Sequence, residues 1–345
     1  MTMEKTGKKQ LDWVLVLLLA GFFICLAPVS ASLAQQIELR AAYYSPDNHP
    51  LTLAAKEVFA DIEKMTQGRV KIKIFASSSL LPTEEMAAGV NEGTAFCANW
   101  YMPYMAKTIP LFNLETIPVW TSGHYKAVIE AYENGLNDLY TKALDRQGLK
   151  NTKIAGVSMC LWRVLTTKKK QVKVPSEAKG MKIRSVGAEA DMWRAIGASP
   201  VNITTPQTYE ALARGVAEGA TNYLETMMDR KWLEHTDYVT CINLSPVLMH
   251  IIYNYKMLEK LSPQDQAIVE TGMKLLAQVT RLRIMEGEGY AFATIPEKFK
   301  TVIYTPDAKE HAEWVKASEP VVANFAKSDD ALVQEALKIV RKYNP

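Results

Sequence analysis

The sequence lacks the short motifs that identify common catalytic and nucleotide-binding sites. Its 5 histidines are scattered, without the HExxH spacing of a zinc protease, and neither a GxxxxGKS/T nor a GxGxxG loop occurs. Residues 156–160, GVSMC, begin like the nucleophile elbow of a hydrolase but have no closing glycine. We therefore predict no catalytic residues, no cofactor and no resident metal, which favours a binding protein over an enzyme.

Cysteine is scarce, and neither sign of charge is in large excess. Of the 4 cysteines, Cys25 lies in an apolar N-terminal run, while Cys97, Cys160 and Cys241 form no CxxC pair and allow at most one internal disulfide. We expect these three to be small buried side chains. The 40 basic and 37 acidic residues leave a formal charge of +3 without a basic stripe, which argues against a nucleic-acid partner.

Residues 1–34 have the three-part pattern of a secretory signal peptide. Basic residues precede an apolar run over residues 14–29, and a segment of small residues follows. Cleavage is expected after Ala34, with Ala31 as the alternative site, and a retained anchor helix is the competing interpretation. No later segment is long and apolar enough to span a bilayer. We therefore expect a periplasmic protein whose mature chain does not insert into the membrane.

Strand-like and helix-like segments alternate along the rest of the chain. Residues 37–43 and 70–75 have the composition of strands, and apolar residues at helical spacing lie between them, from Leu51 to Met65. A second alternating block begins near residue 152. This order of segments predicts an α/β fold with a largely parallel sheet.

A long helix is predicted over residues 262–291, because Ser262 and Pro263 form a helix start and apolar residues recur after them. The residues expected on one face are Ile268, Leu275, Leu276, Val279 and Leu282. A helix of this length can bridge two domains. No flexible linker divides the chain, so we predict two lobes joined by crossing segments. Lobe I comprises residues 35–160 plus about 249–287, and lobe II comprises residues 161–248 plus about 288–345.

Three segments carry a family resemblance. LWRVLTTKKK at 161–170 precedes VPSEAKGMKIRSVGAEADMWRAIGASPVNITTPQTYEALARGVAEGATNY at 174–223, and EKLSPQDQAIV follows at 259–269. In order and spacing they resemble the substrate-binding subunits of tripartite ATP-independent periplasmic (TRAP) transporters, the DctP-like family. The resemblance implies a two-lobed, type II-like periplasmic binding protein. It also implies a function, which is to capture an organic acid and deliver it to a TRAP permease in the inner membrane.

The resemblance also implies ligand-binding residues. Arg184, in MKIR, matches the family arginine that forms a salt bridge with the ligand carboxylate. Arg163, in LWRVLTT, matches a second and more variable arginine at the cleft, and Asn222 matches an asparagine that hydrogen-bonds the ligand. Thr221 stands where many members have an acidic residue, so the polar contacts of the usual ligand need not all be kept.

Physical chemistry agrees with a special role for Arg184. An unpaired cation inside an apolar strand is costly, and a guanidinium matches a carboxylate with two parallel N–H donors. From the strand alone, a structural arginine paired with an internal acid is an equally good interpretation. Aromatic residues near strand ends, Trp100, Trp162 and Tyr44, are predicted to line the cleft, although core packing is the default for any single ring.

Two other functions stay open at this point. An exported enzyme acting on carboxylated substrates would need a base or nucleophile near the arginines, and none can be assembled from the sequence. A ligand-sensing subunit of a receptor would use the same binding site with a different membrane partner.

Overall fold

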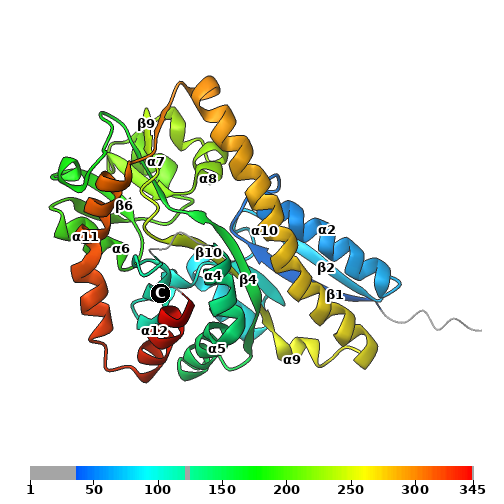
Figure 1. Ribbon diagram of the computed structural model, residues 1–345. Helices are drawn as coiled ribbons and strands as arrows, with labels where there is room; N and C mark the ends of the chain where they lie inside the picture. The colour runs from blue at the N-terminus through cyan, green and yellow to red at the C-terminus, as the bar shows by residue number, and fades with distance from the viewer. Residues whose placement is uncertain (1–35, 121–124, 344–345) are drawn as a thin grey trace, which may run out of the picture. The chain divides into compact units, whose positions relative to one another are not determined.

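The computed structural model of the protein describes residues 36–120 and 125–343, and Figure 1 shows the arrangement of their elements. The predicted signal peptide, with its cleavage sites at Ala31 and Ala34, lies outside these residues, as does the Cys160 side chain. Cys97 and Cys241 are buried free thiols, as expected. None of the described helices is both long enough and apolar enough to cross a membrane.

Within the described residues, five strands form the first sheet, in the order β2-β1-β3-β10-β4. They are β1 (Ile37–Tyr43), β2 (Val70–Phe75), β3 (Cys97–Trp100), β4 (Thr152–Trp162) and β10 (Pro246–Asn254). Strands β1 and β2 have the predicted bounds, and the alternation in β2 buries Val70 and Ile72 while Lys71 stays exposed. Helix α2 (Pro50–Met65) connects them, and β1 pairs in parallel with both β2 and β3.

The second sheet has six strands in the described part of the chain, in the order β11-β9-β5-β8-β6-β7. They are β5 (Val164–Thr167), β6 (Lys182–Ser185), β7 (Ser199–Asn202), β8 (Gly219–Asn222), β9 (Tyr238–Thr240) and β11 (Val302–Tyr304). Strand β6 lies between β7 and β8 and is parallel to both. Helices α6 (Glu189–Ala195), α7 (Thr208–Ala213) and α8 (Leu224–Asp229) follow β6, β7 and β8 in turn.

Both sheets are mixed, so the prediction of a largely parallel sheet is wrong. Strand β10 is antiparallel to β3 and β4, and β5 is antiparallel to β8 and β9. The chain passes directly from the first sheet to the second between β4 and β5, at Arg163, and returns with β10. Two parallel neighbouring strands need a crossover connection between them. Strands that cross directly from one sheet to the other have no such connection and can pair antiparallel with their neighbours.

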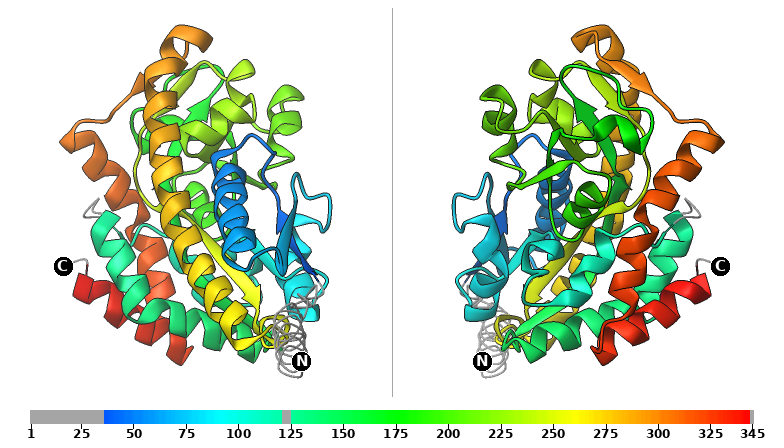
Figure 2. Two further views of the ribbon diagram at one scale, coloured as in Figure 1. Left: turned by 90° about the vertical axis from the view of Figure 1, so that its right-hand side faces the viewer. Right: turned by 90° about the vertical axis from the view of Figure 1, so that its left-hand side faces the viewer.

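Helix α10 (Pro263–Phe299) begins where the sequence predicts and continues beyond residue 291. The Ser262 Oγ accepts a hydrogen bond from the Asp265 N–H at 3.2 Å and caps the first turn. The helix contacts α2 and β4 beside the first sheet and α8 beside the second, and Figures 1 and 2 show it running past both. The predicted bridging helix is therefore confirmed.

The buried face of α10 agrees with the predicted one in Leu276, which is buried, and in Ile268 and Val279, which are partly buried against the core. Leu275 and Leu282 are 43% and 64% exposed, while Gly272 is among the buried residues of the helix. A Cβ atom on Gly272 would lie 2.5 Å from Cδ1 of Ile62 in α2, a distance that real Cβ atoms do not adopt. The close approach of the two helices therefore selects glycine at this position, while Val269, Met273 and Leu276 supply larger apolar side chains to the buried face.

The C-terminal helices pack against elements from both predicted lobes. Helix α11 (Ala308–Ala326) contacts α6, whereas α12 (Ala331–Tyr343) contacts α4 (Tyr125–Ala131) and α5 (Asn137–Arg146). The other described α-helices are α3 (Met86–Glu92) and α9 (Tyr255–Leu258). The lobe boundaries stay a prediction. They assign α12 to lobe II, although this helix packs on α4 and α5, which belong to the predicted lobe I.

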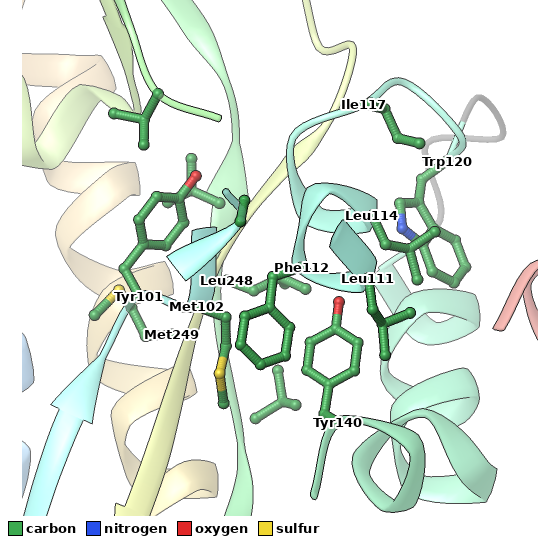
Figure 3. Packing of buried hydrophobic residues seen from close by; sticks show 14 of the residues in the cluster. Tyr101, Met102, Leu111, Phe112, Leu114, Ile117, Trp120, Tyr140, Leu248 and Met249 are labelled. Carbon is green, nitrogen blue, oxygen red and sulfur yellow. The ribbon is translucent and has the colours of Figure 1, made fainter. Parts of the chain in front are cut away.

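A cluster of buried rings and aliphatic side chains fills the space beside β3 and β10 (Figure 3). Phe112 and Tyr140 lie with their ring centroids 4.9 Å apart, and Met102 is next to Phe112 in the figure. Tyr101 and Met249 lie at the edge of this cluster, and the Tyr101 hydroxyl points away from Phe112. These two side chains also line the cavity described below, so one wall of that cavity is part of a close-packed core.

Candidate ligand-binding site

Arg184 lies inside the second sheet, in β6, opposite Val201 of β7 and Ala220 of β8. Its side chain is 2% exposed. The Nε–H donates to the Ile203 carbonyl oxygen at 2.7 Å, Nη1 to the Thr221 carbonyl oxygen at 3.0 Å, and Nη2 to the Thr205 Oγ1 at 3.2 Å. All three acceptors are uncharged, so they orient the guanidinium without neutralising it.

The charge of Arg184 has no ionic partner among the described residues, since none of the ion pairs there includes it. A guanidinium has five N–H donors, and the three hydrogen bonds leave one N–H on each terminal nitrogen. Burial lowers the pKa of the Arg184 guanidinium, which is the direction expected for a desolvated cation. The Trp232 ring, with its centroid 5.7 Å from Cζ, supplies a weak cation–π contact.

Arg163, between β4 and β5, is buried to the same degree but is paired. Its Nη1 lies 3.1 Å from the Glu189 Oε2, and both side chains are nearly inaccessible. Its Nε–H donates to the Ser245 Oγ at 3.2 Å, and Nη2 donates to the Tyr101 hydroxyl at 3.0 Å. Burial alone would lower the pKa of Arg163, but Glu189 and Tyr101 outweigh it and the pKa is raised.

Asn222 ends β8 and is 6% exposed. Its Oδ1 accepts a hydrogen bond from the Tyr223 N–H at 3.0 Å, which fixes the orientation of the amide. In the described residues no hydrogen bond from its Nδ2 is present, so the amide donors are directed to the cavity that Asn222 lines.

The two arginines, Asn222 and Tyr44 meet around one cavity between the sheets, which in this state leaves only about 20 Å³ that the centre of a water-sized molecule can reach. The Tyr101, Tyr104 and Thr205 hydroxyls are on its wall, together with the apolar side chains Val186, Val247 and Met249. Arg163 and Arg184 are its charged lining residues. Larger hollows exist near α11 and at the entrance to the region between the sheets, but the cations that line them are exposed.

Two predicted aromatic residues do not line this cavity. The Trp100 Nε1–H donates to the Thr83 carbonyl oxygen at 3.2 Å, and its ring packs edge-on against Phe112. Trp162 packs against Tyr125, with 5.3 Å between the ring centroids. Both therefore have the core-packing role that is the default for a single ring.

Tyr104 and Thr205 are cavity residues that the sequence did not indicate. The Tyr104 hydroxyl lies 3.4 Å from both Oγ1 and the backbone nitrogen of Thr205, so it connects the segment after β3 to the segment after β7. Thr205 is recognisable in the sequence only as a helix start before Pro206. Tyr104 has no sequence signal, because its position depends on how the two sheets approach each other.

Further polar contacts join loops beside the first sheet to loops beside the second. Arg230, after α8, donates from Nη2 to the Tyr44 carbonyl oxygen at 3.2 Å and stacks over the Tyr44 ring. The Ala188 N–H donates to the Asn113 Oδ1 at 2.9 Å. These contacts, with the Tyr104 pair, describe a state in which the cavity is largely closed.

One group of described residues has the composition of a metal site, with its ligand atoms within 4.8 Å of one another: His49, Glu225 and Asp229. The His49 Nδ1 accepts a hydrogen bond from the Leu51 N–H at 3.2 Å, so in a neutral ring the proton is on Nε2. That nitrogen lies 3.3 Å from the Glu225 Oε2. A metal ion would need the lone pair of Nε2, which the proton occupies. The three residues therefore fit an Nε2–H contact from His49 to Glu225 better than a resident metal.

The sequence comparisons identify the family. A sequence model of "Bacterial extracellular solute-binding protein, family 7", DctP, matches residues 41–329 of the chain. The chain belongs to this family. The predicted membership is thus confirmed. DctP-family proteins are substrate-binding receptors and not enzymes, which supports the binding function over the exported-enzyme alternative.

Curated relatives of this DctP-family chain are distant but cover most of its length. The C4-dicarboxylate-binding protein DctB of Bacillus subtilis (strain 168) is 24% identical over 303 residues, which are 85% of this chain and 83% of the relative. The 2,3-diketo-L-gulonate-binding periplasmic protein YiaO of Escherichia coli (strain K12) is 24% identical over 263 residues, 74% of this chain and 77% of the relative.

Solved structures confirm the two-lobed fold. The Bordetella pertussis extracytoplasmic solute receptor DctP6, which binds pyroglutamic acid, superimposes with a TM-score of 0.81 at 17% identity, covering 89% of this chain and 100% of the receptor. A TRAP periplasmic solute-binding protein from Sulfitobacter sp. NAS-14.1, with bound β-D-galacturonate, gives a TM-score of 0.79 at 17% identity and covers 89% and 99%. At this identity the likeness shows the fold alone.

Proposed function

We propose that this DctP-family protein is a periplasmic receptor that binds an organic acid through its carboxylate and delivers it to a TRAP-type permease. The observation that carries the proposal is Arg184, a buried cation without an ionic partner in the described residues, at the wall of the cavity. A carboxylate in that cavity would accept the two N–H groups that the protein leaves unused. The ion pair would offset the desolvation of the guanidinium.

Other cavity residues support the same ligand chemistry. The Asn222 amide and the Tyr104 and Thr205 hydroxyls are donors that can satisfy further oxygen atoms of an acid. The apolar wall of Val186, Val247 and Met249 suits the body of the molecule. Relatives named for pyroglutamic acid, galacturonate and C4-dicarboxylates show that acids of different shape are bound on this fold.

The location and the membrane partner rest on the family and on residues 1–34. Export by a cleaved signal peptide would place the mature chain in the periplasm, where a receptor can meet both solute and permease. A ligand-sensing role with a receptor kinase would use the same binding chemistry. No observation on the cavity favours that alternative.

A thermal-shift screen of organic acids tests the proposal, with calorimetric titration of each acid that stabilises the protein. A ligand that binds only the folded state raises the melting temperature by mass action. We expect wild type and Arg214→Gln, the matched change at an exposed arginine, to respond alike, and Arg184→Gln to lose the response. Recovery of chemically unchanged acid after incubation distinguishes binding from catalysis. Equal stabilisation of the Arg184→Gln protein would contradict the assignment.

A further inference from the structure

Two buried arginines line one cavity, yet the protein has already supplied an anion to one of them. Glu189, in the first turn of α6, places Oε2 3.1 Å from Nη1 of Arg163. Its other oxygen, Oε1, accepts a hydrogen bond from the Trp193 Nε1–H at 3.1 Å. The Glu189 side chain is 2% exposed, so its carboxylate is buried between Arg163 and Trp193.

Arg163 consequently has a protein partner at each of its three nitrogens. Nη1 faces Glu189, Nε–H donates to Ser245, and Nη2 donates to Tyr101. Arg184, by contrast, donates only to uncharged acceptors; among the described residues Glu189 acts on it from beyond ion-pair distance. The two guanidinium groups therefore differ in what they offer a ligand, although they are equally buried.

The charges at the cavity indicate what the ligand carries. Arg163 and Arg184 contribute two positive charges, and Glu189, 3.1 Å from Nη1 of Arg163, contributes one negative charge. A second buried carboxylate, Glu115, acts less strongly on Arg163 and is paired with the His250 Nε2 at 2.6 Å. The remaining lining side chains are hydroxyl, amide or apolar groups. One carboxylate neutralises this arrangement, whereas a second would be placed in a low-dielectric space next to the buried Glu189 carboxylate.

We propose that Glu189 determines specificity through Arg163: by neutralising that arginine, it restricts the cavity to acids with one carboxylate and an uncharged body. The inference rests on the proposed function, because it takes Arg184 as the anchor of the carboxylate. Glu189 is not among the residues that line the cavity, so it acts as a positioning residue that decides whether Arg163 is available to a ligand. Discrimination arises from a like-charge penalty against the wrong ligand.

Paired probes of equal shape test this proposal. Succinamate and succinate differ by one charge with little change in size, as do the open-chain acids galactonate and galactarate. For each pair the measured quantity is the ratio of the dissociation constants, obtained by calorimetry for wild type and for Glu189→Gln. Gln keeps the length of the side chain and can still accept from Trp193.

For wild type we expect the acid with one carboxylate to bind at least about tenfold more tightly than its partner, since charge mismatches of this kind cost that much or more. Glu189→Gln should shift the ratio toward the dicarboxylate by a further factor of about ten or more, because Arg163 gains a free charge. Glu189→Asp should restore part of the wild-type ratio. The double variant Arg163→Gln with Glu189→Gln, which has no spare cation, should not gain dicarboxylate binding.

The possible failures are distinguishable. Tighter binding of succinate or galactarate by wild type, still abolished by Arg184→Gln, would overturn the specificity proposal and leave the proposed function in place. An unchanged ratio in a folded Glu189→Gln protein would do the same. Binding of all four acids that does not depend on Arg184 would contradict the proposed function itself. Because the wild-type ratio is informative alone, poor folding of Glu189→Gln would not remove the test.

Discussion

Arg184 and Arg163 are two buried arginines of one cavity, and they differ in their counter-ions. Arg163 faces Glu189 and is neutral as a pair, whereas Arg184 is held by two carbonyl oxygens and a hydroxyl. Burial alone therefore does not identify a ligand anchor. The informative quantity is the charge that remains after the protein's own partners are counted, because an uncompensated cation is tolerated only where an anion arrives.

The largest expected effect comes from breaking the paired site. Arg163→Met leaves Glu189 buried without its partner, and we expect the ligand-free protein to lose about 3–5 kcal/mol of unfolding free energy. Chemical denaturation measures this loss. Adding Glu189→Gln removes the orphaned charge and should recover most of it. A loss below about 1 kcal/mol in the single variant would show that the pair does not stabilise the protein and would weaken the contrast.

The unpaired site should respond in the opposite way. Arg184→Lys keeps the charge but loses the planar pair of donors, so we expect ligand binding to weaken by about 2–4 kcal/mol. The ligand-free protein should be as stable as wild type or slightly more stable. Calorimetric titration and ligand-free melting of the same variant give both values, with Arg214→Lys as the control. Lost stability with retained affinity would make Arg184 a structural arginine like Arg163.

A smaller, pH-dependent effect is expected where α8 meets α10 and α2, a region whose excess charge is negative. Burial raises the pKa of the Glu288 carboxyl to about 7, and burial and the Glu225 charge raise the pKa of Asp229 to about 6. In the unfolded chain the pKa of Glu288 returns to 4.5 and that of Asp229 to 3.8. At a pH between the unfolded and the folded pKa of each group, the folded protein therefore binds more protons than the unfolded chain. The contribution of these two groups to the free energy of unfolding is therefore fully present below about pH 4 and is lost as the pH rises through 6 to 7.

Melting curves of wild type and Glu288→Gln between pH 5 and 8 test this sign. The wild-type melting temperature should fall over this range, and the variant should fall less, because Gln cannot ionise. The facing groups are His49, which caps α2, and Glu225 and Arg230, on and after α8. The Glu288 carboxylate also accepts hydrogen bonds from the backbone N–H groups of Leu224 and Glu225. Identical pH slopes in the two proteins would show that Glu288 titrates at an ordinary value.

The smallest effect is expected at the contact between the two sides of the cavity. Tyr104→Phe removes a hydroxyl whose distances to Thr205 are long, so we expect binding to weaken by at most about 1 kcal/mol.

Small-angle scattering should show a smaller radius of gyration with ligand than without it, in wild type and in the variant. An unchanged radius at saturation would indicate a preformed, rigid cavity.

The sequence predicted local structure and the charged part of the site well. Alternation and composition were sufficient for β1 and β2, and Ser262 with Pro263 located the start of α10. Motif order brought Arg184, Arg163 and Asn222 to one cavity, as the structure confirms in geometry, although their contact with a ligand stays a prediction. These features depend on residues that are close in sequence or that occupy fixed positions in a family pattern.

The remaining features depend on packing between distant segments. Trp100 was predicted at the cavity but lies against Phe112, because a strand-end ring can turn either to the cavity or to the core. On α10, Leu275 and Leu282 are exposed although they were predicted on the buried face, and the contact with Ile62 falls on Gly272, which a search for large apolar residues overlooks. The pairing of Glu189 with Arg163 joins positions 26 residues apart, with β5 and β6 between them, and has no local signal.

Helix α10 determines which movements the two halves can make. It is one continuous rod from Pro263 to Phe299, and Gly287 lies where a Cβ atom would be 3.0 Å from Cγ of Glu225 in α8 and 3.4 Å from Cγ of Pro50 in α2. Elements that meet so closely at a shared rod cannot slide past one another without steric overlap. We therefore expect the halves to move by rotation about an axis near this junction, which needs little repacking. Opening of the cavity would then displace most the edge that is farthest from α10.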